Sequence, residues 1–211
     1  VSGTIGAVGN NGLGVAGVNW QTRIMPIKIF SNAGSFGTIS DVVAGVFYVI
    51  THRIRGVPLR VTNHSWGGTG YNQVLRDALE IAGGQGIMHV AAAGNQGNLN
   101  NDATPHYPAS FDLSNVLAVA NTSESDALHY TSHYGATSVD LAAPGVGIES
   151  TLPGGYGEKS GTSMSCPHVT GVAAMMFGYM PELTWQEVRQ AILDGVDIVP
   201  GLAGKCVTGG R

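Results

Sequence analysis

Charged residues are scarce in this chain. They make up 11% of its 211 residues, against about 25% in an average soluble protein. The few lysines and arginines are scattered and the formal net charge is −4 at pH 7, which argues against nucleic acid as a partner. Long apolar runs are lacking as well, since none reaches the roughly 18 residues that a membrane span needs. We therefore expect no membrane-spanning segment.

Cysteine is nearly absent. Cys166 and Cys206 are the only two, which excludes a disulfide framework and a zinc site of four cysteines. One bridge is the most that they could form, and nothing in the sequence supports it.

Among the histidines, His129 and His133 have the spacing of a metalloprotease motif, but they lie in a polar, turn-prone segment without the required glutamate. We interpret both as surface or core histidines.

Glycine, in contrast, is abundant, with 32 residues, roughly twice the usual share of about 7%. Many small residues with little charge indicate tight packing and many turns. Residues 12–17, GLGVAG, match the dinucleotide-binding pattern G-x-G-x-x-G. That pattern needs a strand directly before it and a helix directly after it, whereas the preceding GAVGNN favours a turn. We interpret 12–17 as a glycine-rich loop rather than a cofactor site.

Strand-like and helix-like segments alternate along the chain. Helical periodicity and capping residues predict helices at 38–53, 71–84, 163–180 and 183–193. Apolar or alternating runs predict strands at 23–30, 59–65, 87–93, 116–121, 138–145 and 147–151. This alternation predicts a single α/β domain of three layers, in which helices flank a mostly parallel central sheet.

One short segment, SGTSMSCPHVTGVAAMM at 160–176, gathers several candidate nucleophiles. Ser163 follows Gly161-Thr162 and begins the predicted helix, so its side chain lies at the helix end that favours a developing negative charge. Pro167 is expected in the first turn, where a missing N–H costs little. The alternative is that Ser163 is an ordinary helix-capping serine. We interpret the remaining hydroxyls of the segment as turn and cap groups, and Cys166 as a packed thiol.

Two further segments follow predicted strands, where ligands bind in parallel α/β sheets. Asn95 ends AAAGN and could donate to an oxyanion; the alternative is a turn-forming asparagine. NHSWGG at 63–68 ends another strand. Its glycines leave backbone groups bare, so we expect a peptide substrate to pair with them as an added strand.

These segments together resemble a known family. GTSMSCPHVTGVAA (161–174) resembles the active-serine signature of the subtilisin-like serine proteases, G-T-S-M-x-x-P-H-V-x-G. AAAGN (91–95) resembles their oxyanion segment, NHSWGG (63–68) their substrate-binding strand, and residues 1–18 the stretch after their catalytic histidine. The resemblance runs nearly end to end, with the motifs in the family's order.

The resemblance implies a role for each matching position. Ser163 is the nucleophile, and Asn95 forms the oxyanion hole together with the backbone N–H of Ser163. Two segments line the primary specificity pocket: Ser65, Trp66 and Gly67 on one wall, and Ala92, Ala93 and Gly94 on the other. His168 is the signature's structural histidine; it lies about 140° around the helix from Ser163 and cannot act as its base.

The resemblance also implies a structural calcium ion and no catalytic cofactor. The loop after the family's catalytic histidine often binds calcium. Here the ligands would be the side chain of Asn11 and backbone carbonyls near Val8 or Gly9, at Leu13 and at Val15. Oxygen ligands of this kind suit calcium.

The rest of the catalytic triad is not among these residues. The family orders its triad Asp, His, Ser, and its histidine begins the motif H-G-T-H-V, of which this chain holds only the valine, Val1. The resemblance therefore implies a partial peptidase domain, cut at both ends, that needs an upstream segment of the same domain for activity. His64 lies beside Ser65, but no aspartate is evidently placed to orient it, so we do not expect it to replace the missing base.

The sequence therefore predicts a serine endopeptidase that acts on peptides or proteins, with a broad preference for an apolar or aromatic residue before the scissile bond. We base the expected apolar or aromatic preference on Gln96 and on the lack of an obvious acidic residue in the pocket walls. Family habit implies secretion, although residues 1–211 show no signal-peptide pattern. The alternative is a non-catalytic pseudoprotease that binds peptides without cutting them.

Overall fold

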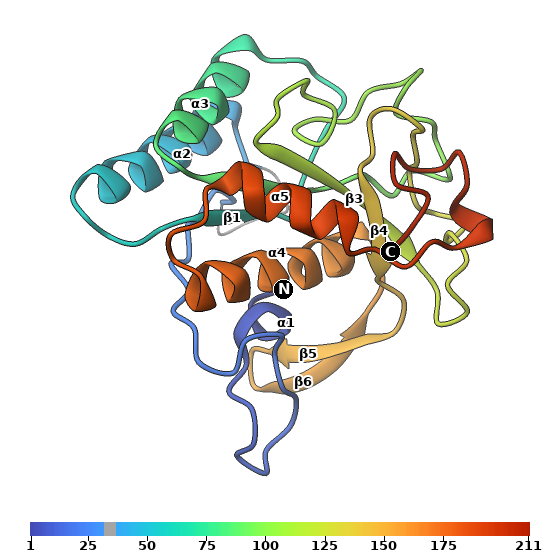
Figure 1. Cartoon of the computed structure of the whole chain (residues 1–211), viewed down its shortest axis with the longest axis horizontal. Coiled ribbons are helices and arrows are strands. Elements are labelled where there is room, and N and C mark those ends of the chain that lie inside the picture. The colour runs from blue at the N-terminus through green and yellow to red at the C-terminus, as the bar shows by residue number, and fades with distance from the viewer. Residues whose placement is uncertain (32–36) are drawn as a thin grey trace.

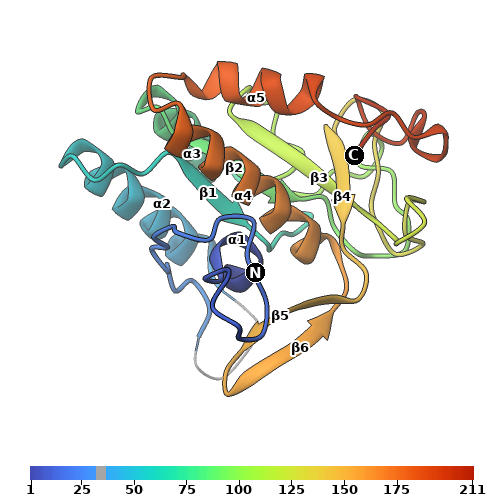
Figure 2. The ribbon, with the colours of Figure 1, turned by 60° about the horizontal axis from the view of Figure 1, so that its bottom comes forward.

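The central sheet has four parallel strands. In the computed structural model, which describes residues 1–31 and 37–211, the strands lie side by side in chain order (Figures 1 and 2). They are β1 (Val61–His64), β2 (Met88–Ala92), β3 (Val116–Thr122) and β4 (Leu141–Pro144). The four predicted strands between residues 59 and 145 are thus confirmed, with slightly shorter bounds.

Helices cover both faces of this sheet, which makes three layers (Figure 2). One face carries α2 (Ile39–Ile54) and α3 (Gln73–Gly84), and the other carries α4 (Thr162–Tyr179) and α5 (Trp185–Asp194). Successive strand residues alternate between the two cores, as a period of two requires. Ala91 packs beneath α2 and α3, whereas Val90 packs beneath α4 and α5. The predicted three-layer α/β fold is confirmed.

The helices begin where their capping residues place them. Thr38 and Asp41 form a capping box at the start of α2, and Thr184 and Glu187 form another at the start of α5. Each box satisfies two backbone N–H groups that a helix start leaves without partners. Local sequence therefore sets these boundaries, which is why both helices were predictable.

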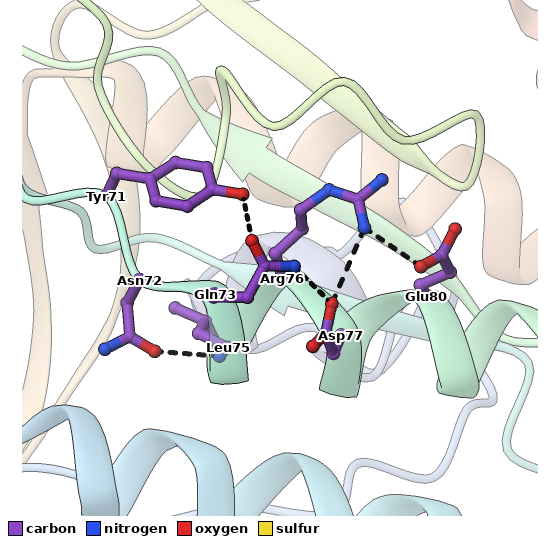
Figure 3. Close-up of polar contacts among 7 residues, drawn as sticks. All are labelled: Tyr71, Asn72, Gln73, Leu75, Arg76, Asp77 and Glu80. Atoms are coloured by element: carbon purple, nitrogen blue, oxygen red, sulfur yellow. Dashed lines mark hydrogen bonds and ion pairs between the residues drawn. The ribbon is translucent and has the colours of Figure 1, made fainter.

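Figure 3 shows the start of α3, where a side chain also caps the helix. The Asn72 Oδ1 atom accepts a hydrogen bond from the Leu75 N–H at 2.9 Å. On the solvent face of the helix, Arg76 and Glu80 form an ion pair of 2.9 Å one turn apart. Leu75 and its neighbours on the opposite face are buried against the sheet, so the helix is amphipathic as its periodicity predicts.

Three further elements were not predicted. They are α1 (Ser2–Gly6), β6 (Gly155–Lys159) and the 3₁₀ turn η1 (Pro200–Leu202). The predicted strand at 147–151 is present as β5 (Ile148–Leu152), but it pairs antiparallel with β6 in a separate two-stranded sheet (Figures 1 and 2). It therefore does not extend the central sheet.

The predicted strand at 23–30 is wrong, because these residues form no strand. A groove of about 630 Å³ separates them from β1, which is the edge strand of the central sheet. An extended segment becomes a strand only when a neighbour completes its backbone hydrogen bonds. The apolar pattern of 23–30 reflects side chains, such as Ile27, that pack against the core of α2 and α3.

Both cysteines are buried free thiols, so they form no disulfide. Burial raises the pKa of Cys166 to about 12, which agrees with its interpretation as a packed thiol. Within the described ranges, no helix combines the length and apolar character needed to cross a membrane.

Candidate active site

Ser163 is the second residue of α4, and a glycine that turns the chain directly precedes this helix. Gly161 is the N-cap of α4 and has φ +141°, a left-handed conformation that favours glycine. A Cβ atom at this position would lie 3.2 Å from the Asn95 side-chain oxygen. Glycine therefore lets the turn approach Asn95 closely and leaves Ser163 half-buried at the helix start.

The position of Pro167 differs from the prediction. Because α4 begins at Thr162, Pro167 lies in its second turn, where its missing N–H removes the helical bond to the Ser163 carbonyl. The Ser65 hydroxyl donates to this carbonyl instead, at 2.9 Å. The Ser163 hydroxyl in turn donates to the Ser65 carbonyl at 3.2 Å. This reciprocal pair joins the predicted nucleophile to the end of β1.

Asn95 and the start of α4 are joined by a second set of contacts, made by Thr162. The Asn95 Oδ1 atom accepts from the Thr162 backbone N–H at 2.9 Å and from its hydroxyl at 3.1 Å. The same hydroxyl accepts from the Gly94 N–H at 3.2 Å. The sequence indicates only a turn or cap hydroxyl for Thr162. Its partners are more than 60 residues away in sequence, so no local pattern could indicate this role.

These contacts fix the orientation of the Asn95 amide. Since Oδ1 is occupied by Thr162, the Nδ2 group is the end available to donate. Asn95 is exposed, and the N–H of Ser163 in the first turn of α4 has no partner within the helix, as at every helix start. The arrangement thus offers two N–H donors and the positive end of a helix to an anion.

The two predicted pocket walls follow neighbouring parallel strands. His64 of β1 is in register with Ala91 of β2, and Ala92 is the last residue of β2. Ser65–Gly67 and Ala93–Gly94 therefore leave the sheet side by side. Ala92 and Ala93 are buried in two different cores. They can therefore present only backbone groups to a ligand.

The expectation that all glycines of NHSWGG leave bare backbone groups is wrong for one of them. Gly68 donates to and accepts from Tyr107, at 2.9 and 2.7 Å. Among the described residues, Trp66 and Gly67 make no backbone–backbone hydrogen bond. The segment open to an added strand is therefore shorter than predicted, and it ends at Gly67.

Two histidines near Ser163 are turned to other partners. His168 Nδ1 lies 2.8 Å from the Met164 carbonyl of its own helix. His64 Nε2 lies 2.8 Å from the Thr62 hydroxyl and 3.1 Å from His89 Nδ1, and burial lowers its pKa to about 4. A buried imidazole with these partners is poorly suited to take a proton from Ser163, as we expected for both residues.

The loop predicted to bind calcium surrounds a small hollow of about 220 Å³, lined by Val8–Ala16. Asn11 Oδ1 accepts from the Leu13 N–H at 3.0 Å, which folds the loop around the hollow. Amide and carbonyl oxygens are ligands that calcium accepts, so the donor types fit. The residues that line the hollow include no aspartate or glutamate.

Together these features define an α/β protein in which a serine at a helix start faces an asparagine donor from the end of a neighbouring strand. Residues 1–204 match the sequence profile of the subtilase family. The chain therefore belongs to the subtilase family.

Family members and solved structures are similar to this chain over most of its length, as three examples show. Thermitase from Thermoactinomyces vulgaris is 38% identical over 95% of this chain and 67% of its own length. Subtilisin E from Bacillus subtilis is 35% identical over 91% of this chain and 48% of its own length. A solved protease structure from Pseudoalteromonas arctica has a TM-score of 0.84 at 31% identity, covering 99% of this chain and 65% of that one. The chain spans about half the length of the first subtilisins it matches.

Proposed function

We propose that these residues belong to a serine endopeptidase in which Ser163 is the nucleophile, and Asn95 and the Ser163 N–H form the oxyanion hole. The observation that supports this most is the double tether of the Asn95 oxygen to Thr162. Because Thr162 holds the Asn95 oxygen, the Asn95 N–H₂ group points away from Thr162 and is available to donate. A turn-forming asparagine would have no need of that restraint.

The proposed chemistry follows from these positions. The Ser163 oxygen attacks the peptide carbonyl carbon, while its proton passes to a base and the carbonyl oxygen becomes an oxyanion that receives the two N–H donors. The protonated base then gives its proton to the leaving amine, which leaves an ester on Ser163. Water then attacks the ester while the base takes the proton of the water. The base passes this proton to the Ser163 oxygen, and the acid product leaves.

The base and its orienting aspartate are proposed to come from an upstream segment of the same domain. The open edge of β1 supports this, because the groove beside it gives an added segment access to Ser65 and Trp66, next to Ser163. For residues 1–211 alone we expect at most residual activity, as for a triad reduced to its serine and oxyanion hole.

The substrate is proposed to be an extended peptide or protein segment. It would pair with the free backbone groups of Trp66 and Gly67 on one side and pass Ala92–Gly94 on the other. The apolar or aromatic preference stays our expectation, because the two walls offer no acidic side chain. One similar protein, from Dichelobacter nodosus, is named an extracellular basic protease, and we propose secretion for this one.

The test uses the full-length protein that contains these residues, with a chromogenic peptide substrate. Ser163→Ala should abolish turnover above the residual level, and Asn95→Ala should lower kcat by about 10²–10³-fold, the range typical for loss of an oxyanion donor in this family of enzymes. Ser160→Ala is the matched control, since Ser160 is exposed and its hydroxyl only accepts from the Gly147 N–H.

Two results would overturn the proposal. The first is equal turnover by the wild type and Ser163→Ala. The second is a folded full-length protein that binds peptides without hydrolysing them, which would establish the pseudoprotease alternative.

We also propose that calcium, when bound, is held by the Asn11 side chain and by loop carbonyls that include those of Leu13 and Val15. Its contribution would be to the stability of the loop, with no role in the reaction. Gly14 keeps this loop against β6, since a Cβ atom there would overlap the Tyr156 ring at 1.9 Å.

A further inference from the structure

His133 is a buried histidine that the proposed reaction does not use, yet it contacts the turn that carries Asn95 from behind. Its side chain is 1% exposed. Its backbone N–H donates to the Gly94 carbonyl at 2.9 Å, and its Nε2 atom accepts from the Gln96 N–H at 3.0 Å. Both residues that flank Asn95 are therefore anchored to His133.

The hydrogen-bond network sets the tautomer of this imidazole. Because the Gln96 N–H can only donate, Nε2 must carry a lone pair, and the ring proton is on Nδ1. Nδ1 then donates to Asn101 Oδ1 at 2.8 Å. The Asn101 amide nitrogen donates to the Ala93 carbonyl at 2.9 Å, so the network closes on the same turn with every donor facing an acceptor.

The turn has little room to adopt another shape. Gly94 has φ +120°, and a Cβ atom there would lie 2.5 Å from His133 Nδ1. The ring therefore packs directly against the Gly94 backbone. On its other side the turn is tied to Thr162, so Asn95 lies between two anchors.

The surroundings favour the neutral ring. Burial lowers the pKa of His133. The titratable side chain that faces it is His106, whose ring lies edge-on at 5.1 Å between centroids and whose own pKa burial lowers to about 4. The nearby Asp102 carboxylate is occupied by Thr137 and Ser138.

We propose that His133 is a positioning residue that holds the Gly94–Gln96 turn through its Nε2 atom and thereby aims the Asn95 amide at the oxyanion. This inference rests on the proposed function of Asn95. His133 acts on Asn95 only through the backbone. It orients the peptide groups on both sides of Asn95, and these peptide groups determine the direction of the Asn95 side-chain amide.

Two substitutions distinguish the roles of the two ring nitrogens of His133. His133→Gln places an acceptor where Nε2 lies and can keep the Gln96 bond, whereas His133→Asn keeps a donor near Nδ1 and loses the Gln96 bond. In the full-length protein we expect His133→Asn to lower kcat by about ten- to a hundredfold, the cost of a misplaced catalytic group, with KM changed less than about threefold. His133→Gln should recover most of that loss, and His129→Asn is the matched control.

Equal kcat for the Gln and Asn variants would overturn the proposal, because a purely structural role makes no such distinction between the nitrogens. Nitrogen-15 NMR of the wild-type histidines tests the tautomer without any variant: we expect an unprotonated Nε2, and a proton there at neutral pH would overturn the proposal too. Asn95→Ala separates the two proposals. If it leaves kcat unchanged, the oxyanion role fails; if it lowers kcat while His133→Asn does not, only the role of His133 fails.

Discussion

Thr162→Val tests how firmly the Thr162 hydroxyl joins the Asn95 turn to α4. Valine has the shape of threonine, so the substitution removes one hydroxyl and opens no cavity. The buried Gly94 N–H then loses its acceptor, which costs about 1–3 kcal/mol, and the bond to Asn95 Oδ1 is worth about 1 kcal/mol. We therefore expect the free energy of unfolding to fall by about 2–4 kcal/mol.

Guanidinium unfolding of the purified protein measures this change, and Thr162→Ser is the matched control. Serine keeps the hydroxyl and loses only a methyl group, at a cost of about 1 kcal/mol. Thr162→Val should also lower kcat of the full-length protein more than Thr162→Ser does, since Asn95 would keep one of its two tethers. A valine variant as stable as the serine variant would refute the reasoning.

Two other predictions concern pH and calcium. The pKa of buried His64 is about 4 in the folded chain and about 6.5 in an unfolded one, so the unfolded state binds more protons between these values and stability falls as pH drops from about 6.5 to 4, by up to about 3 kcal/mol. His64→Gln should make this dependence shallower in unfolding curves taken across that range, while buried His89 and His106, whose pKa values are also lowered by burial, keep part of it; unchanged slopes would contradict the prediction. Calcium should raise the Tm of the wild type and not that of Asn11→Ala, with magnesium as the control ion; equal shifts in both proteins would disprove the site.

The elements predicted best from sequence are those that local chemistry specifies. The helix at 38–53 has its own capping box, and the strand at 116–121 is buried on both faces, so neither depends on a distant residue to be recognised. The strand at 23–30 has an equally suitable pattern. It fails because a strand also needs a partner, and β1 lies across a groove from it.

The elements that were missed carry weak local signals. α1 is a five-residue helix with two glycines, held from outside by Val18 and Asn19, whose N–H groups donate to its Thr4 and Ile5 carbonyls. β6 is rich in glycine and mostly exposed. Neither has the apolar periodicity by which an element is recognised from sequence.

In the candidate site, too, the residues marked by local sequence could be predicted and those that depend on distant contacts could not. Ser163 and Asn95 could be located because Ser163 begins a predicted helix and Asn95 follows a predicted strand, and because the motifs around them resemble a family. Thr162 and His133 hold these residues through contacts between segments 37 to 68 residues apart. Such contacts exist only in the folded chain, so no local pattern indicates them, and the sequence of the His133 segment favours no more than a surface or core histidine.

The proline in α4 has a consequence for how the site becomes ordered. An uninterrupted helix would complete its own first turns as soon as it formed. With Pro167 in place, the Ser163 carbonyl lacks its helical donor and finds one only in Ser65, at the end of β1. The hydrogen bonds at the start of α4 are therefore all formed only when the helix has docked on the sheet. The turn that carries Ser163 becomes ordered together with the rest of the domain.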